Sequence, residues 1–209
     1  MQFHDVEQNT EEWLDLKIAK LSGSKISCVM ANYGKAFGDP AKRLAVSIAR
    51  EQVTGKRSLA EQYSNAHMER GHEQEPIARM LYEEETFTDV LNGGFFDCGR
   101  EGCSPDGRVG EHGLIEIKSV IDHVHYANIK RGGVDPAYKW QTIFNVDRSQ
   151  REWIDFVSYC ADFPEQTRLY IHRVYREECE KEIAMINDRV GEFFEMVNQM
   201  KRVITGETA

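Results

Sequence analysis

Residues 103–118 read CSPDGRVGEHGLIEIK, and this stretch decides the fold class of the chain. A Pro-Asp-Gly turn around Asp106 is followed by a short apolar run ending at Lys118, a pattern typical of strands joined by a tight turn. Because side chains alternate along a strand, Glu116 and Lys118 project from the same face, and the isoleucines beside them project from the other. The sequence therefore predicts a sheet with a buried back and a charged front.

Asp106, Glu116 and Lys118 form a set suited to metal-dependent hydrolysis. Two carboxylates suit Mg²⁺, which keeps several waters and takes the rest of its shell from substrate phosphate. A lysine beside them can orient or deprotonate the attacking water and offset negative charge on the phosphorane. A Glu-x-Lys pair alone is also common on exposed amphipathic strands. The preceding Pro-Asp-Gly turn makes the combination more specific.

Two flanking segments supply further candidates for the same site. Gly71 and Glu75 lie one helical turn apart in a predicted helix, so Glu75 can reach a site that faces this helix. Glu73 competes with Glu75 for that role. Gln141 follows the strands in another predicted helix, close to Tyr138.

The rest of the chain predicts helices around these strands. Asp39 is expected to be the N-cap of a helix that has Pro40 in its first turn and ends near Thr54. A bend is expected near Gly71 and Pro76 in the helix over residues 65–85. Further helices are predicted over residues 10–18, 122–130, 136–146 and 177–204.

Residues 86–119 are expected to form consecutive strands joined by tight turns, and two later strands are expected at 153–157 and 169–175. This order of elements predicts an α/β or α+β fold, with a mixed β-sheet flanked by helices. No linker or repeat divides the chain, so a single domain is expected over residues 1–209.

The charge of the chain limits the ways in which it can bind nucleic acid. The net charge is −9, which excludes a broadly basic protein that coats DNA. Residues 1–60, however, carry nine lysines and arginines against seven acidic residues. An enzyme with a local basic channel beside a carboxylate-rich metal site remains compatible with this distribution.

Composition also bears on the cellular location. No run of 18 apolar residues is present, so no membrane span is expected, and the first residues lack the basic-then-apolar order of a signal peptide. The five cysteines form no CxxC pair, which favours reduced thiols in the cytoplasm.

The motifs together resemble the lambda-exonuclease (YqaJ-type) phage recombinases of the PD-(D/E)xK nuclease superfamily. The resemblance extends from Trp13 to the C-terminal helix and rests on the order and spacing of six pieces. These pieces are WLDLK at 13–17, SGS at 22–24, GHEQE at 71–75, CSPDG at 103–107, GLIEIK at 113–118 and YKWQ at 138–141. It implies a restriction-endonuclease-like sheet flanked by helices.

The resemblance also implies a role for each matching residue. Asp106 and Glu116 would ligate the catalytic metals, two Mg²⁺ ions that Mn²⁺ can replace, and Lys118 would position the attacking water. Glu75, favoured over Glu73 by this match, and Gln141 would assist them. The 5′-phosphate of a DNA end would bind a further group: Lys17, Ser24 and Ser104.

Two positions depart from the pattern of the family. Lys17 stands where an arginine is common, and a lysine offers a point charge in place of a bidentate fork. Lys20 or Lys25 could provide some of the contacts with the phosphate. Ile143 stands where related sequences often have a second glutamine.

The function implied is a 5′→3′ double-strand DNA exonuclease that leaves 3′ single-stranded tails for phage-type recombination. The resemblance further implies a homotrimeric ring, a single-strand-annealing protein as partner, and the cytoplasm of a bacterial host. Two alternatives stay open from the sequence. One is an endonuclease or nickase of the same fold, and the other is a DNA-binding recombination module without catalysis, against which the complete Asp106, Glu116 and Lys118 set argues.

Overall fold

The strands form two sheets in the computed structural model, which describes residues 1–58 and 66–207, with the backbone alone at 66–69 and 72. The smaller sheet has the order β1–β4–β5–β2, formed by β1 (Gln2–His4), β4 (Phe95–Asp97), β5 (Glu101–Cys103) and β2 (Leu21–Ser22). The larger has the order β3–β6–β7–β8–β9, formed by β3 (Val90–Asn92), β6 (Gly107–Val109), β7 (Gly113–Ser119), β8 (Trp153–Tyr159) and β9 (Leu169–Tyr175). Both sheets are mixed, because β2 pairs with β5 and β7 with β8 in parallel.

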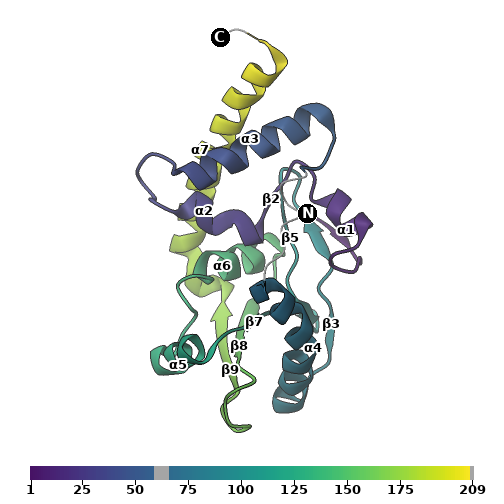
Figure 1. The fold of residues 1–209 in the computed structure, drawn as a ribbon, viewed down its shortest axis with the longest axis vertical. Coiled ribbons are helices and arrows are strands. Elements are labelled where there is room, and N and C mark those ends of the chain that lie inside the picture. Colours follow the sequence, from purple (N-terminus) through teal and green to yellow (C-terminus); the bar gives the residue numbers. More distant parts are fainter. Residues whose placement is uncertain (59–65, 208–209) are drawn as a thin grey trace.

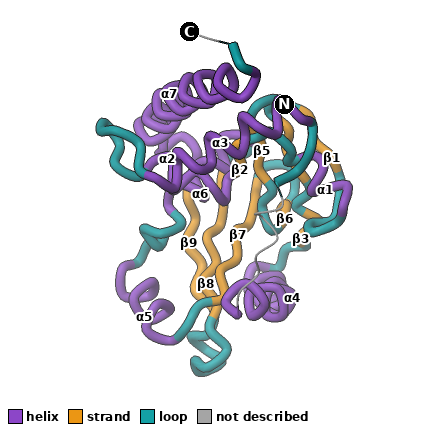
Figure 2. The backbone as a smooth tube through the Cα atoms, turned by 45° about the horizontal axis from the view of Figure 1, so that its top comes forward, coloured by secondary structure: helices purple, strands orange, loops and turns teal. Residues whose placement is uncertain are grey.

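Helices surround these sheets, as Figures 1 and 2 show. They are α1 (Glu11–Leu16), α2 (Ile26–Met30), α3 (Asp39–Thr54), α4 (Ala66–Thr86), α5 (Asp122–Arg131), α6 (Lys139–Arg148) and α7 (Glu180–Thr205). Two 3₁₀ turns, η1 (Gly23–Lys25) and η3 (Arg176–Cys179), precede α2 and α7. The predicted fold, a mixed sheet flanked by helices, is confirmed, although two sheets are present where one was expected.

The two faces of β7 belong to different cores. Leu114 packs with residues of α2, α3, α6 and α7, whereas Ile115 and Ile117 pack with Ala78 and Tyr82 of α4. The alternation along the strand therefore separates the side of the sheet that α6 covers from the side that α4 covers. The charged residues of β7 share the face of Leu114.

The expected meander of strands is wrong at one point. The segment Asn92-Gly93-Gly94 does not join paired strands, because β3 pairs with β6 and β4 pairs with β1 and β5. The chain passes from one sheet to the other there, and a Cβ on Gly93 would lie 1.8 Å from the carbonyl oxygen of Pro105. The glycine allows a close crossing of backbones rather than a hairpin.

Helix boundaries differ from the prediction at several ends. Gly38 is the N-cap of α3 and Asp39 its first residue, one position earlier than expected. The last predicted helix before β8 begins at Lys139 instead of 136, and α7 begins at Glu180, after the η3 turn. Helix α2 was not predicted, since only a polar turn was read around Gly23.

Other helices agree with the prediction. Thr10 caps α1 by accepting a hydrogen bond from the Trp13 amide, and α5 ends at Gly132 in the left-handed conformation. Helix α4 differs, because it is one continuous helix through Gly71 and Pro76, where an interruption was expected, and its expected start at residue 65 lies outside the described residues. Across residues 1–58 and 66–207, no helix combines the length and apolar character that a membrane span requires.

Candidate active site

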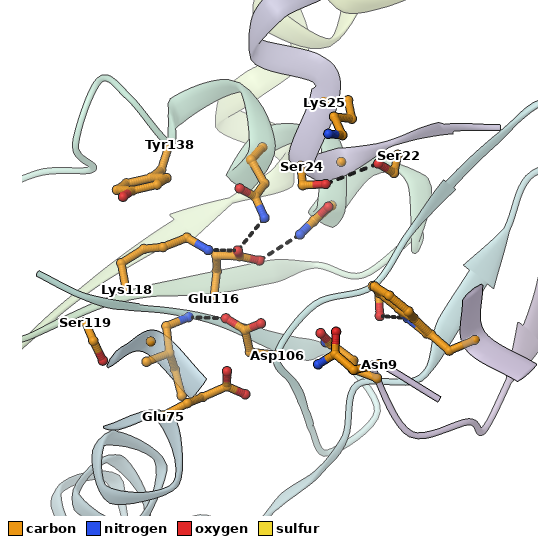
Figure 3. A pocket seen from close by; sticks show the side chains of 18 of the residues that line it. Asn9, Ser22, Ser24, Lys25, Glu75, Asp106, Glu116, Lys118, Ser119 and Tyr138 are labelled. Carbon is orange, nitrogen blue, oxygen red and sulfur yellow. Dashed lines mark hydrogen bonds and ion pairs between the residues drawn. The ribbon is translucent and has the colours of Figure 1, made fainter. Parts of the chain in front are cut away.

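The charged face of β7 carries the centre of the site. Glu116 is fully buried, and the Nζ atom of Lys118 lies 2.5 Å from its Oε1 atom. The two side chains come from the same face of the strand, as their spacing predicts (Figure 3). A buried carboxylate is thus paired with a half-buried ammonium group near the end of a central strand.

Asp106 reaches this centre from the turn before β6. Its amide donates a hydrogen bond to the carbonyl of Ile115 at 3.1 Å, and its Oδ2 atom accepts one from the amide of Ile117 at 2.6 Å. Strand β6 pairs with β7 only at residues 113–115, so Asp106 takes the place of a neighbouring strand beside the next part of β7. The divergence of the two strands opens the edge of the sheet.

Helix α6 holds the Glu116 carboxylate from above. The side-chain amide of Gln141 donates to Oε1 at 2.5 Å, and that of Asn145 donates to Oε2 at 2.8 Å. Asn145 was missed in the sequence, although its position four residues after Gln141 puts it on the same helical face. Ile143, at the position of the second family glutamine, is buried in the core.

The loop before α2 also contacts Asn145. A Cβ on Gly23 would lie 2.2 Å from the Oδ1 atom of Asn145, so only glycine allows η1 to approach α6 this closely. The hydroxyls of Ser22 and Ser24 are 3.2 Å apart on either side of this glycine. The Ser-Gly-Ser segment is therefore placed at the site by backbone contact.

Glu75 comes from the opposite side of the sheet. In Figure 3 it extends from α4 toward Asp106, and it lines the same pocket, whereas the side chain of Glu73 is exposed. Seven residues further along α4, the Tyr82 hydroxyl donates to Asp155 on β8 at 2.7 Å. Because seven residues are two helical turns, this bond anchors the face of α4 that presents Glu75.

Burial and the nearby negative charges raise the pKa values of both glutamates in the site. Burial, then the charge of Asp106, raises the pKa of Glu75 to about 7. The same two causes raise the pKa of Glu116 to about 7. Burial lowers the pKa of Lys118, but the charges of Glu116 and Asp106 outweigh this, and the net shift is upward. The site therefore concentrates negative charge that one ammonium group offsets only in part.

These residues fit a hard divalent cation. A cation beside Asp106 and Glu116 would relieve the repulsion that raises the pKa values of the glutamates. Among the side chains that the structure describes, no three histidine, cysteine or acidic groups converge closely enough to enclose an ion. An ion here would complete its shell with water and substrate, which is the habit of Mg²⁺.

The predicted phosphate-binding residues lie in the same pocket. Its volume is about 710 Å³, and its lining includes all eight candidates: Lys17, Ser24, Glu75, Ser104, Asp106, Glu116, Lys118 and Gln141. The three phosphate-binding candidates come from different segments: Lys17 is the C-cap of α1, Ser24 lies in η1, and Ser104 lies in the loop after β5. Segments far apart in the sequence are thus brought to one cavity.

Trp13 organises the phosphate end of the pocket, although the sequence assigned it no role in the site. The Nζ atom of Lys17 lies 3.7 Å from the centre of its ring, and its Nε1 atom donates to the Ser104 hydroxyl at 2.9 Å. That hydroxyl donates in turn to the carbonyl of Gly94 at 2.5 Å. Since a hydroxyl has one proton, Ser104 can donate to a phosphate only after turning away from Gly94.

The mixed sheet and the Asp106, Glu116 and Lys118 site define a nuclease of the PD-(D/E)xK class. The sequence profile of the YqaJ-like viral recombinase domain matches residues 12–150. The chain belongs to this family.

Solved structures agree with this assignment. The chain is 30% identical to an alkaline exonuclease, LHK-Exo from Laribacter hongkongensis, with a TM-score of 0.77 over 95% of this chain and 100% of that one. The complex of LHK-Exo with dAMP gives a TM-score of 0.78 at the same identity and coverage. A phage related exonuclease from Haemophilus somnus 129PT, at 16% identity and a TM-score of 0.66 over 90% and 96% of the two chains, shares the fold. No curated protein matches the chain.

These findings confirm the predicted family, the predicted fold and the predicted enzyme class, an exonuclease of the recombination type. The predicted roles of individual residues stay predictions, as do the metal, the direction of digestion and the assembly.

Proposed function

We propose that this chain is a Mg²⁺-dependent 5′→3′ exonuclease of double-stranded DNA that leaves 3′ single-stranded tails for homologous recombination. One observation carries the proposal: Asp106, Glu116 and Lys118 share a pocket with a cationic, hydroxyl-lined end that includes Lys17 and Ser24. If this end of the pocket binds the terminal phosphate of a DNA strand, the phosphodiester bond at the hydrolytic centre is one near the end of that strand. The proposed location is the bacterial cytoplasm.

The chain's own residues divide the work of phosphodiester hydrolysis. Asp106 and Glu116 would hold the Mg²⁺ ions, two in number and replaceable by Mn²⁺, while Gln141 and Asn145 fix the orientation of the Glu116 carboxylate. Bound Mg²⁺ supplies Lewis acidity toward the phosphate and makes water more acidic. Lys118 orients the attacking water. Its ammonium group also offsets the negative charge that develops on the phosphorane.

Glu75 assists from the other side of the pocket. Its carboxylate extends toward Asp106 in the same pocket, so it can accept a hydrogen bond or a proton from the attacking water. Its reach toward Asp106 places it where the phosphodiester would lie between the two faces (Figure 3). Glu75 would therefore act on the attacking water, whereas Asp106 and Glu116 would be occupied as metal ligands.

The principal rival is an endonuclease or nickase of the same fold, and the second is a module that binds DNA without cutting it. We expect a linear duplex labelled at each end in turn to lose its 5′-terminal nucleotides first, in the presence of Mg²⁺ and not in EDTA. A circular plasmid should stay intact under the same conditions. Cutting of the plasmid would establish the endonuclease. Absence of any Mg²⁺-dependent cleavage would favour the binding module.

A terminal 5′-phosphate should be preferred over a 5′-hydroxyl end. A terminal phosphate carries more charge than an internal diester and accepts stronger charge-assisted hydrogen bonds. Lys17→Ala should reduce this preference by about tenfold, roughly the 1.4 kcal/mol of one such bond. Initial rates on duplexes that differ only in the 5′ group measure it, with the exposed Lys35→Ala as the matched control. Equal rates on both ends in the unaltered protein, or an unchanged preference in Lys17→Ala, would refute the phosphate pocket.

We further propose that three copies form a ring around DNA and that a single-strand-annealing protein, as their partner, binds the 3′ tail. The net charge of −9 leaves a single copy with weak hold on DNA at physiological salt, where phosphate contacts carry most of the affinity. A closed ring retains threaded DNA even where each contact is weak. It also needs only one heterologous interface, repeated by symmetry.

A further inference from the structure

Helix α3 exposes a row of alternating basic and apolar side chains. Arg43, Val46, Arg50 and Val53 follow one another at intervals of three and four residues, which keeps them on one face of the helix. Val46 is 48% exposed and Val53 is 39% exposed. The opposite face of α3 carries Ala45, Ile48 and Ala49 into the core beside α7. We refer to the exposed row as the α3 face.

Helix α4 exposes a row of the same spacing and opposite charge. Glu73, Ile77, Met80 and Glu84 are separated by four, three and four residues, again on one side of the helix. Ile77 is 43% exposed and Met80 is 48% exposed. The buried Ala78 and Tyr82 lie on the other side, against the sheet. This second row is the α4 face.

Charge around the two faces is complementary as well. Residues 39–57 contain five basic side chains against two acidic ones, namely Lys42, Arg43, Arg50, Lys56 and Arg57 against Asp39 and Glu51. Residues 73–89 contain one arginine against six acidic side chains, namely Arg79 against Glu73, Glu75, Glu83, Glu84, Glu85 and Asp89. The two faces are therefore opposite in charge, and each also exposes two apolar side chains, seven residues apart on α3 and three apart on α4.

Phe87 extends the α4 face beyond the end of the helix. Its side chain is 94% exposed, and its backbone has a φ of 53°, a left-handed conformation that a bulky residue rarely adopts. A helix end of this shape normally favours glycine. A phenylalanine at this position gains nothing from the fold of its own chain, and its apolar ring is available to a neighbour.

The α3 face and the α4 face cannot contact each other within one copy of the chain. Their side chains are exposed to solvent, except for Arg50, which is half-buried and donates to the carbonyl of Lys56, and Figure 1 places α3 and α4 toward opposite ends of the long axis of the molecule. A contact between them needs two copies. It joins two different surfaces, so each copy keeps one free face of each kind for a further neighbour. Such a contact is the kind that closes into a ring.

We propose that the α3 face of one copy packs against the α4 face of the next. Val46 and Val53 would meet the apolar side chains Ile77 and Met80, and the arginines would lie against Glu73 and Glu84. The number of copies, three, rests on the proposed ring, whereas the pairing of the faces rests on their own residues. None of these residues lines the candidate active site.

Charge reversal tests this pairing. One variant carries Arg43→Glu and Arg50→Glu, a second carries Glu73→Arg and Glu84→Arg, and a third combines all four. Light scattering of the unaltered chain should give about three times 24.1 kDa. Either double variant should weaken association by at least about tenfold and shift the mass toward that of one copy. The fourfold variant should restore the assembly, because the complementary charges have changed places.

Controls separate assembly from folding and from catalysis. Glu195→Arg with Lys201→Glu reverses two charges on exposed positions of α7 without changing the net charge, and should leave the mass unchanged. Circular dichroism checks that each variant is folded, and Met80→Gln weakens the contact without altering charge. All variants should still release nucleotides from a short duplex in Mg²⁺, so failed assembly and failed nuclease activity are distinguishable.

Several results would overturn the pairing. A mass of one copy for the unaltered chain would do so, as would an unchanged mass in both double variants. A fourfold variant that stays dissociated would exclude a direct contact between the two faces. Loss of DNA binding in the α3 variant at constant mass would assign that face to DNA. Binding of an annealing protein that only the α4 variant loses, again at constant mass, would assign that face to the other partner.

Discussion

Asp106→Asn and Glu116→Gln should each reduce Mg²⁺-dependent cleavage of linear duplex DNA by more than about a thousandfold. The reason is that each change removes a charged ligand from a site where charge stabilisation by a bound cation is worth several kcal/mol, and about 1.4 kcal/mol corresponds to a factor of ten in rate. Both replacements keep the shape of the side chain, so the fold should survive. The rate of nucleotide release at saturating Mg²⁺ measures the effect.

Matched controls use acidic residues outside the pocket. Asp122→Asn at the start of α5 and Glu111→Gln in the turn before β7 alter exposed residues in the same way and should retain the full rate. Circular dichroism should show the same unfolding temperature for Asp106→Asn as for the unaltered chain within a few degrees. Activity near that of the unaltered chain in either ligand variant would remove Asp106 and Glu116 as the metal site.

Lys118→Ala should lower the rate by at least about a hundredfold, since groups that position or transfer protons contribute roughly 10² to 10⁴. The affinity for duplex DNA should change little, because a single ammonium group paired with Glu116 makes only a small part of the contact with phosphates. Single-turnover rates and binding by fluorescence anisotropy measure the two quantities separately.

The exposed Lys130→Ala serves as the control for a lost positive charge. If Lys118→Ala weakened DNA binding and left the single-turnover rate intact, Lys118 would be a phosphate contact and not part of the hydrolytic centre.

The central triad could be predicted because its geometry is local. Glu116 and Lys118 lie on one strand, where alternation fixes their common direction, and Asp106 lies in the turn directly before the neighbouring strand. Contacts of this range depend on few degrees of freedom, and the residues that set them are adjacent in the sequence. The pairing of β6 with β7 and the C-terminal ends of α3 and α5 could be predicted from the sequence for the same reason.

Long-range contacts account for what was missed. Two sheets are present because the chain crosses from β3 to β4 beside Pro105, a passage that Gly93 permits and that looks like a hairpin turn in the sequence. The family match already favoured Glu75 over Glu73, but the reason that Glu75 lines the pocket is the packing of α4 on the sheet, which the bond between Tyr82 and Asp155 holds.

The sequence by itself determined the nuclease motif, the family and the order of helices and strands, because these are encoded in local spacing and in the side chains that carry the chemistry. The tertiary structure decided which amides hold Glu116, how Trp13 joins Lys17 to Ser104, and which helical faces are left exposed. Each of these depends on segments separated by many residues. Their approach is set by the packing of the core, and the pattern of any one segment does not contain it.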